Sequence, residues 1–566
     1  MGIDMKKRGL KKIVIAVLVS GMLLLSSCGK GAESSLSSDG SAPEDIVYNV
    51  KDGVAVPKAA KSDKLYVYSL GTDSTEAKKA AYALQGLISQ QEAEVYLMTD
   101  GFPQDQEWLE ELKGEYSEVI DVKIEEETGF LQLFKDYKDR VKKILVYDPS
   151  REKDYTWNVA MTLGSLEGGL PMPNGLLRIV QDKVGYDGEV VDLTNKWASK
   201  EEAYDYLIEE LLPKTNKQVM FCLDPQQALR HADYAMAARC TTFWLNETKS
   251  ADLKILNKIF GSGHFNENAI IMGYGDASDG KSGDNLLVAS NPYGIGFLCS
   301  DWFGNGTVFS SIESVEMPKQ PAGKAAPIEL GKTYVCMFWS DGDNIQYDQI
   351  ALKKAWNNPN RGKIPVASTV APLLTEIAPT IMKWYRANMT ENDELMAGPS
   401  GWQFIYCSRY EEELLKSWSD KNKYWMERAG MTVANMWLFD PRTDKQACET
   451  ILTRSGLDAV FTPNVALTFS KAYDEYGTLI FNAPGNLWNT KKGELYDQVL
   501  SNFIAKPDEA KFVTVNNIQE GSINKGTYDV LIQEVELVQE LKPDTYVFLR
   551  PSDFVATYRE YMKTQE

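Results

Sequence analysis

Histidine is almost absent from this 566-residue sequence, which contains only His231 and His264. Both lie in the first half of the chain, so the second half has no imidazole for the Ser-His-Asp mechanism of hydrolysis. A zinc-dependent polysaccharide deacetylase would need histidine ligands after its second strand, where this chain carries "STVAPLL". Carboxylates remain as the acid–base groups, and we predict neither a metal site nor a cofactor.

Several other motifs are missing. The chain has no GxxxxGK[ST] phosphate loop, and "GYGDASDG" (273–280) lacks the glycine spacing of a dinucleotide-binding fingerprint. The cysteines that follow Cys28 include no CxxC pair, which argues against a disulfide framework or a zinc knuckle. The formal charge of −20 repels phosphate backbones, so we predict no nucleic-acid partner and leave neutral ligands open.

The first residues form a targeting segment. A basic stretch containing Lys6 to Lys12 precedes the apolar run Ile13–Leu25, which is too short to span a bilayer and has the length typical of a secretory signal. The segment ends in Leu25-Ser26-Ser27-Cys28, which resembles the lipobox of bacterial lipoproteins. This resemblance implies cleavage after residue 27 and a lipid anchor on Cys28, outside the bacterial membrane. Residues 28–62, rich in Ser, Gly, Ala and Lys, are predicted to be a flexible tether.

Two larger regions follow. Residues 63–316 alternate β-rich runs with helical patterns, which predicts an α/β domain with a parallel sheet. A junction rich in Pro, Gly, Ala and Lys covers 317–331. Residues 332–566 contain eight β-like runs, separated mostly by helical patterns, at 334–339, 364–370, 394–399, 432–439, 459–463, 479–484, 511–516 and 545–551. This count predicts a (β/α)8-like barrel domain, with an open doubly wound sheet as the competing fold.

Polar residues follow these runs, at the strand ends that carry the active site in such barrels. Asp341 and Asp343 come directly after the first run, and in an extended chain they would point to one side with Cα atoms roughly 6.5 Å apart. Two carboxylates this close raise the pKa of one of them, which suits the acid–base pair of a glycosidase. Helix capping by one aspartate, or a Ca²⁺ site shared with Asn344, are the alternatives.

Other rim positions are candidates for substrate binding. They come from the ends of several strands and combine amide, hydroxyl and carboxylate groups with aromatic rings, which suit sugar hydroxyls and the apolar faces of sugar rings. We predict this role for Ser340, Asn344, Ser400, Trp402, Tyr406, Asp440 and Asn464. Turn chemistry alone would also enrich Asp, Asn and Ser at these positions.

The stretch "AGPSGWQFIYC" (397–407) resembles the GxGYxYP family of bacterial two-domain glycoside hydrolases. "SDGDN" (340–344) and the closing "LRPSDFVATYREYM" (549–562) agree with it. The resemblance implies an N-terminal α/β domain and a C-terminal barrel-like hydrolase domain. This sequence departs from the signature, because Gln403 replaces a glycine, Phe404 a tyrosine and Cys407 a proline.

We therefore predict a lipid-anchored surface protein that cleaves a glycosidic bond, with Asp341 and Asp343 as its carboxylates and a carbohydrate as its ligand. A non-catalytic glycan-binding lipoprotein on the same scaffold is the main alternative. A solute-binding lipoprotein would need several crossings between two similar lobes, and the single Pro/Gly/Ala junction argues against it.

Overall fold

The structure is a computed structural model that describes residues 48–280, 283–340, 344–437, 439–440, 443–462, 472–483, 485–488, 493–518 and 527–565. Cys28, Asp341, Asp343 and Asn464 lie outside the described residues. No helix in the described part of the chain is both long enough and apolar enough to cross a membrane.

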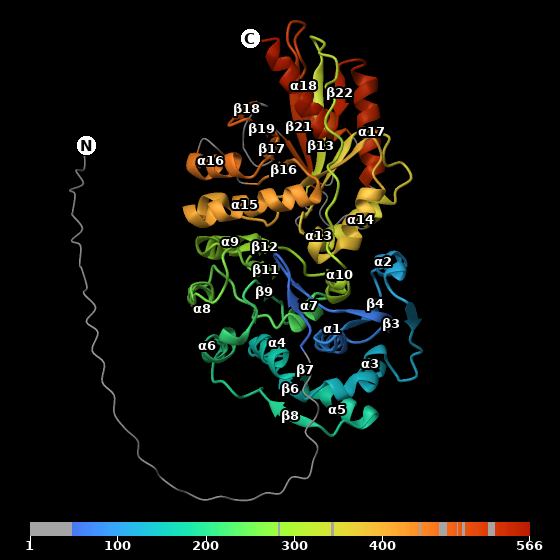
Figure 1. The fold of residues 1–566 in the computed structure, drawn as a ribbon, viewed down its shortest axis with the longest axis vertical. Coiled ribbons are helices and arrows are strands. Elements are labelled where there is room, and N and C mark those ends of the chain that lie inside the picture. Colours follow the sequence, from blue (N-terminus) through green and yellow to red (C-terminus); the bar gives the residue numbers. More distant parts are fainter. Residues whose placement is uncertain are drawn as a thin grey trace, which may run out of the picture. The chain divides into compact units, whose positions relative to one another are not determined.

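Three small parallel sheets form the first half of the described chain (Figure 1). The first, in the order β4-β3-β5, contains β3 (Lys61–Gly71), β4 (Ala93–Thr99) and β5 (Glu118–Asp121). The second, in the order β7-β6-β8, contains β6 (Lys143–Tyr147), β7 (Gly169–Pro173) and β8 (Glu189–Asp192). The third, in the order β10-β9-β11-β12, contains β9 (Val219–Cys222), β10 (Thr242–Phe243), β11 (Ile270–Gly273) and β12 (Gly296–Leu298). The α/β pattern predicted for this region is confirmed, but its strands are shared among three sheets.

Helices connect these strands as the sequence pattern predicts. They are α1 (Thr75–Ser89), α2 (Gln104–Leu112), α3 (Gly129–Tyr137), α4 (Tyr155–Glu167), α5 (Asn174–Val184), α6 (Lys200–Tyr206), α7 (Ala232–Ala237), α8 (Ser250–Phe260), α9 (Leu286–Ser290) and α10 (Gly306–Ser311). Helix α1 begins where Ser74 Oγ accepts a hydrogen bond from Ala77 N, which satisfies one of the unpaired N–H groups of the first turn. Helix α1 packs against α7 and β7, so the small sheets share a core.

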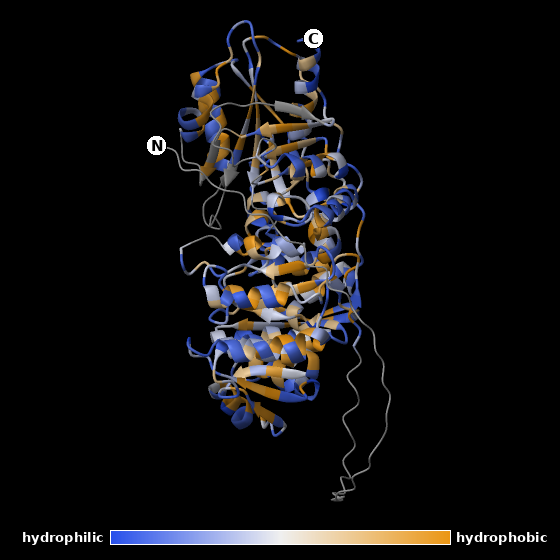
Figure 2. Ribbon diagram, turned by 90° about the vertical axis from the view of Figure 1, so that its left-hand side faces the viewer, coloured by the Kyte–Doolittle hydropathy of each residue, from blue (hydrophilic) through white to orange (hydrophobic). Residues whose placement is uncertain are grey.

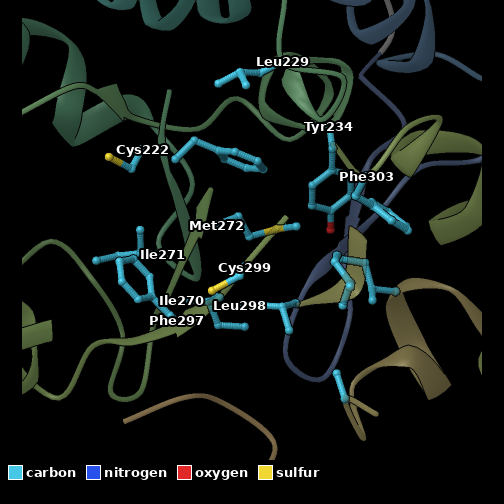
Figure 3. Close-up of a cluster of buried hydrophobic side chains, with 14 of the residues drawn as sticks. Cys222, Leu229, Tyr234, Ile270, Ile271, Met272, Phe297, Leu298, Cys299 and Phe303 are labelled. Atoms are coloured by element: carbon cyan, nitrogen blue, oxygen red, sulfur yellow. The ribbon is translucent and has the colours of Figure 1, made fainter. Parts of the chain in front are cut away.

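The core of the third sheet lies on both sides of β11. Figure 3 shows Met272, Leu298 and Phe303 together with Tyr234 in this buried cluster. Strands buried on both faces are nearly continuous apolar runs, which explains why "AIIMG" and "FLC" lack the alternation of a half-exposed strand.

The last part of the predicted tether is folded. Strands β1 (Lys51–Asp52) and β2 (Pro57–Lys58) pair as a short hairpin. The carboxylate of Glu376, which is 1% exposed, accepts hydrogen bonds from Val54 N, Ala55 N and Val56 N. Since residues 48–62 are held in this way, the prediction that they are flexible is corrected.

The junction between the two regions is extended and bound along the barrel. Val315 N, Met317 N and Gln320 N donate hydrogen bonds to backbone carbonyls of residues 375, 428 and 430. The Gln320 side chain also pairs with the backbone N–H and C=O of Leu395. The many Pro, Gly and Ala residues of the junction suit a segment that follows a surface without forming its own sheet.

All eight predicted runs of the second half are strands of a nearly closed parallel barrel sheet: β13 (Thr333–Ser340), β14 (Val366–Val370), β15 (Asp393–Ala397), β16 (Val433–Asn435), β17 (Ala459–Thr462), β19 (Thr478–Asn482), β21 (Lys511–Ile518) and β22 (Tyr546–Leu549). Two short strands, β18 (Ala472–Glu475) and β20 (Gly485–Trp488), join it. The helices are α11 (Ile345–Gln349), α12 (Ala351–Trp356), α13 (Leu374–Ile377), α14 (Pro379–Ala387), α15 (Glu412–Ala429), α16 (Lys445–Arg454), α17 (Thr527–Leu541) and α18 (Pro551–Lys563). Figure 2 shows hydrophobic residues on many of the barrel strands.

The strand order departs from that of a regular (β/α)8 barrel. Strand β21 pairs with β13 along its whole length, from Thr333 to Ser340. Strand β22 therefore takes the other edge of β13 and pairs at Thr333–Cys336, which leaves only Phe338 and Trp339 to pair with β14. Strand β13 thus lies in the centre of the sheet with three neighbours.

Side chains alternate between two cores along β13. Cys336 and Phe338 belong to a cluster with Phe461, Phe481 and other residues from the surrounding strands, so this set points into the barrel. Their neighbours Val335 and Met337 pack into the larger core outside it. Because side chains in a strand alternate in direction, Ser340 shares the inward direction of Phe338.

Candidate functional site

Strand β13 ends inside the barrel at a polar group. Ser340 Oγ accepts hydrogen bonds from Asn435 Nδ2 (3.0 Å) and Trp437 Nε1 (3.1 Å), which come from the end of β16. Since both neighbours are donors, the Ser340 hydroxyl can give its own hydrogen to a third group. Asn435 Oδ1 is buried without a hydrogen-bond donor among the described residues. The carboxyl end of β13 therefore carries both donor and acceptor capacity.

The residues that follow the candidate carboxylates connect the barrel to the third sheet. Asn344 caps α11 through its side chain, which accepts from Tyr347 N, so the structure gives it a helix-capping contact. Ile345 N donates to Cys299 O (2.9 Å), and the Gln346 side chain accepts from Trp302 N (2.6 Å). The residues after β12 are thereby held next to the start of α11.

The signature stretch 397–407 docks on the third sheet. Phe404 and Phe297 exchange two backbone hydrogen bonds of 2.9 and 3.0 Å, so this loop adds a bridge to the edge strand β12. Gln403 Nε2 donates to the carbonyls of Asn268 and Ala269. Ser400, predicted to bind substrate, instead forms hydrogen bonds with the backbone of Ile405 and closes the loop on itself.

Trp402 and Tyr406 are buried, which corrects their prediction as open sugar platforms. Trp402 is 2% exposed and stacks on Trp425. Tyr406 is 7% exposed, and its hydroxyl donates to Asp284 Oδ2 at 2.7 Å. Burial, followed by the neighbouring Asp284 charge, raises the pKa of Tyr406, which therefore stays protonated. Tyr406 thus bonds to a residue between β11 and β12, whereas Trp402 packs on helix α15 of the barrel.

Asp440 lies at the predicted end of the fourth run, just beyond β16. Its backbone carbonyl accepts from Thr443 N and from Asp444 N, and Asp444 is the N-cap residue of α16. Among the predicted residues, the structure thus brings Ser340 to the inner rim together with Asn435 and Trp437. It places Asn344, Ser400, Trp402 and Tyr406 in capping or docking contacts.

Sequence reasoning missed a second group of carboxylates, on the third sheet. Asp224 follows β9 and Asp301 follows β12, and both line a cavity of about 680 Å³. Burial, followed by the nearby Asp224 charge, raises the pKa of Asp301 to about 7. The sequence did contain a signal for Asp224 and Asp301, because "FCLD" and "LCSD" are apolar runs that end in aspartate, as "FWSD" does.

No group of three or more His, Cys, Asp or Glu side chains in the described residues is arranged to hold a metal ion.

Models of one protein family match most of the chain. A family model described as "GxGYxYP putative glycoside hydrolase C-terminal domain" matches residues 331–559. The models described as "GxGYxYP third domain" and "GxGYxYP_N 1st domain" match residues 217–311 and 64–139. Among curated proteins, no sequence matches this chain.

Two solved structures are similar. One, described as "a putative hydrolase" from Bacteroides thetaiotaomicron VPI-5482, has a TM-score of 0.77 and 19% identity, over 91% of this chain and 99% of that one. It shares the fold. The other, described as a "putative polysaccharide deacetylase" from Mycobacterium smegmatis, has a TM-score of 0.31 and 11% identity, over 44% of this chain and 96% of that one. A similarity this low supports no conclusion about fold or function.

Proposed function

The chain belongs to the GxGYxYP family, and from this premise we propose that it hydrolyses glycosidic bonds with Asp341 and Asp343 as its reacting carboxylates. In this chemistry a protonated carboxyl gives its proton to the leaving glycosidic oxygen, and an ionised carboxylate acts as a nucleophile or activates water. The absence of histidine from the barrel region agrees with a mechanism that uses carboxylates alone.

The observation that carries the proposal is the polar group at the end of β13. Asp341 follows Ser340 directly in the sequence, and Ser340 is fixed by two hydrogen bonds in the interior of the barrel. Active sites of barrel enzymes lie at the carboxyl ends of the strands. A rigid residue immediately before a reacting group supports the preorganisation that catalysis requires.

The proposal includes action at the cell surface, anchored through Cys28. The support is in the sequence alone: a basic stretch, a short apolar run and the Leu25-Ser26-Ser27-Cys28 motif.

A non-catalytic glycan-binding protein is the second candidate, because the signature is altered at Gln403, Phe404 and Cys407. All three side chains are buried, and Gln403 and Phe404 contact the third sheet. These changes therefore affect the docking loop more than an open sugar surface, which favours the hydrolase.

The test is a panel of oligosaccharides incubated with the mature protein, with product release measured by chromatography. We expect Asp341→Asn and Asp343→Asn each to reduce turnover by about 10²–10⁴-fold, the usual contribution of a general acid or base. Asp508→Asn is the matched control, since Asp508 is an exposed turn residue at the opposite end of the barrel strands. Equal product release from the wild type and both variants would overturn the assignment. Binding without turnover by the wild type would establish the glycan-binding alternative.

A further inference from the structure

The cavity of about 680 Å³ opens at a position that binds ligands in many α/β sheets. In the order β10-β9-β11-β12, the chain leaves β9 toward β10 and then crosses to β11 on the other side of β9. The point between β9 and β11 is therefore the topological switch point of this sheet, where the loops after the two strands separate. Asp224 follows β9 and Tyr274 follows β11, and both line the cavity.

Three carboxylates in the cavity are held by hydrogen bonds. Asp224 accepts from Gln226 N and from Gln227 Nε2, both at 2.8 Å. Asp154 accepts from Gln226 Nε2 at 2.9 Å, and Asp276 accepts from Ser278 N at 2.9 Å. These bonds fix the carboxylates before any ligand arrives, so little entropy is lost when they bind one.

Asp301 differs from the other three. Its backbone carbonyl accepts from Arg230 N and from His231 Nδ1, but its carboxyl group forms no hydrogen bond with any described residue. Asp301 is half-buried and lines the cavity, so a ligand could displace water from its carboxyl group and bond to it directly. Near neutral pH its raised pKa leaves a substantial protonated fraction, so Asp301 can donate while Asp224 accepts. A sugar hydroxyl, which both donates and accepts, matches such a pair.

The remaining lining groups narrow the ligand class. Trp244 and Tyr274 line the cavity and are partly exposed, and aromatic rings suit the C–H face of a sugar ring. Four aspartates and one arginine, Arg151, line the cavity, and Lys249 pairs with Asp276 at 3.7 Å, so the carboxylates outnumber the cations and disfavour anionic ligands. The volume lies within the range of small-molecule sites and leaves room for more than one sugar unit.

We propose that this cavity is a second saccharide-binding site, in the third sheet, that selects uncharged or amine-bearing sugars and rejects uronates. All of its described lining residues lie between Arg151 and Asp301, outside the barrel. The inference does not depend on Asp341 or Asp343.

The experiment measures binding by calorimetry to the full mature chain carrying Asp341→Asn and Asp343→Asn, so that no probe is consumed. The probes are short oligosaccharides of matched length: neutral hexose oligomers, glucosamine oligomers and galacturonate oligomers. We expect a neutral or glucosamine oligomer to bind at least tenfold more tightly than the galacturonate oligomer. Trp244→Ala should weaken that binding at least tenfold.

Asp224→Asn preserves the size of the side chain and keeps the variant series informative if Trp244→Ala does not fold. Asp224→Asn should weaken binding of the glucosamine oligomer and reduce the ratio of its affinity to that of the galacturonate oligomer. Asp508→Asn should change neither the affinity nor the ratio. The proposal is overturned if no neutral or amino oligomer binds, if galacturonate binds equally well, or if both cavity variants bind as their parent does. If the cavity does not bind as proposed but the wild type hydrolyses an oligosaccharide, the proposed function is retained and the second site is rejected. If the cavity binds as proposed but the wild type hydrolyses no oligosaccharide, the second site is retained and the proposed function is rejected.

Discussion

Gln403, which replaces a glycine of the family signature, allows a test of how the docking loop (397–407) is held on β12. Its side chain is 1% exposed and donates to Asn268 O at 2.9 Å and to Ala269 O at 3.2 Å. Ala269 O also accepts from Gly296 N, so it keeps one donor when Gln403 is shortened. No such second donor to Asn268 O is found among the described residues.

The cost of Gln403→Ala follows from these contacts. Losing the hydrogen bonds and leaving a buried carbonyl unsatisfied costs roughly 2–4 kcal/mol. Gln403 Oε1 is itself buried without a partner among the described residues, so removing it returns roughly 1 kcal/mol. We therefore expect docking of the loop on β12 to weaken by about 1–3 kcal/mol.

The assay is hydrogen–deuterium exchange of the amides of Phe297 and Phe404, which bond to each other's carbonyls. Local opening that is easier by about 1–3 kcal/mol speeds exchange by about 5- to 150-fold. Gln446→Ala is the matched control, because among the described residues that exposed side chain bonds to Glu412 alone, on the surface. Exchange at Phe297 and Phe404 that is equal in Gln403→Ala and Gln446→Ala would refute the docking role.

Three further outcomes are expected. Ser340→Ala should lower the free energy of unfolding in urea by about 1–3 kcal/mol, because the buried Asn435 and the half-buried Trp437 lose the acceptor of their N–H groups. Ser340→Thr should recover most of this loss, and an unchanged midpoint in Ser340→Ala would contradict the prediction. Cys28→Ser should abolish incorporation of labelled fatty acid and release the protein from membranes, whereas labelling that persists would exclude this anchor. Asp301 has a folded-state pKa of about 7, above its usual value, so ionisation disfavours the folded state, and stability falls between about pH 4 and pH 7. Asp301 shares its cavity with Asp154, Asp224, Asp276 and Arg151. Because Asp301→Asn cannot ionise, its free energy of unfolding relative to that of the wild type should rise by up to about 4 kcal/mol between about pH 4 and pH 7, measured by urea unfolding at each pH. A difference between the two proteins that does not change with pH would refute the assignment.

Local patterns alone were enough for much of the architecture. The eight apolar runs of the second half are all strands, and the helical stretch after Ser74 begins at that residue's cap. The long helix α15 ends at Gly430, which adopts the left-handed conformation that glycine accepts most readily. These features depend on periodicity and capping, which act over a few residues.

Only part of the candidate site could be predicted from local sequence patterns. The position of Ser340 at a strand end could be predicted, because polar residues that follow a buried run mark the carboxyl edge of a parallel sheet. The burial of Trp402 and Tyr406 could not be predicted, because Trp402 packs on Trp425 of α15 and Tyr406 bonds to Asp284, which are both distant in the sequence.

The sequence by itself determined the strands and the family, both of which depend on short stretches of residues. Only the tertiary structure decided that β21 and not β22 runs along the whole of β13, that the signature loop docks on β12, and that Asp224 and Asp301 share one cavity. The reason is that each of these contacts joins residues far apart in the chain. Such contacts are chosen by the packing free energy of the whole fold, to which any one segment contributes only a part.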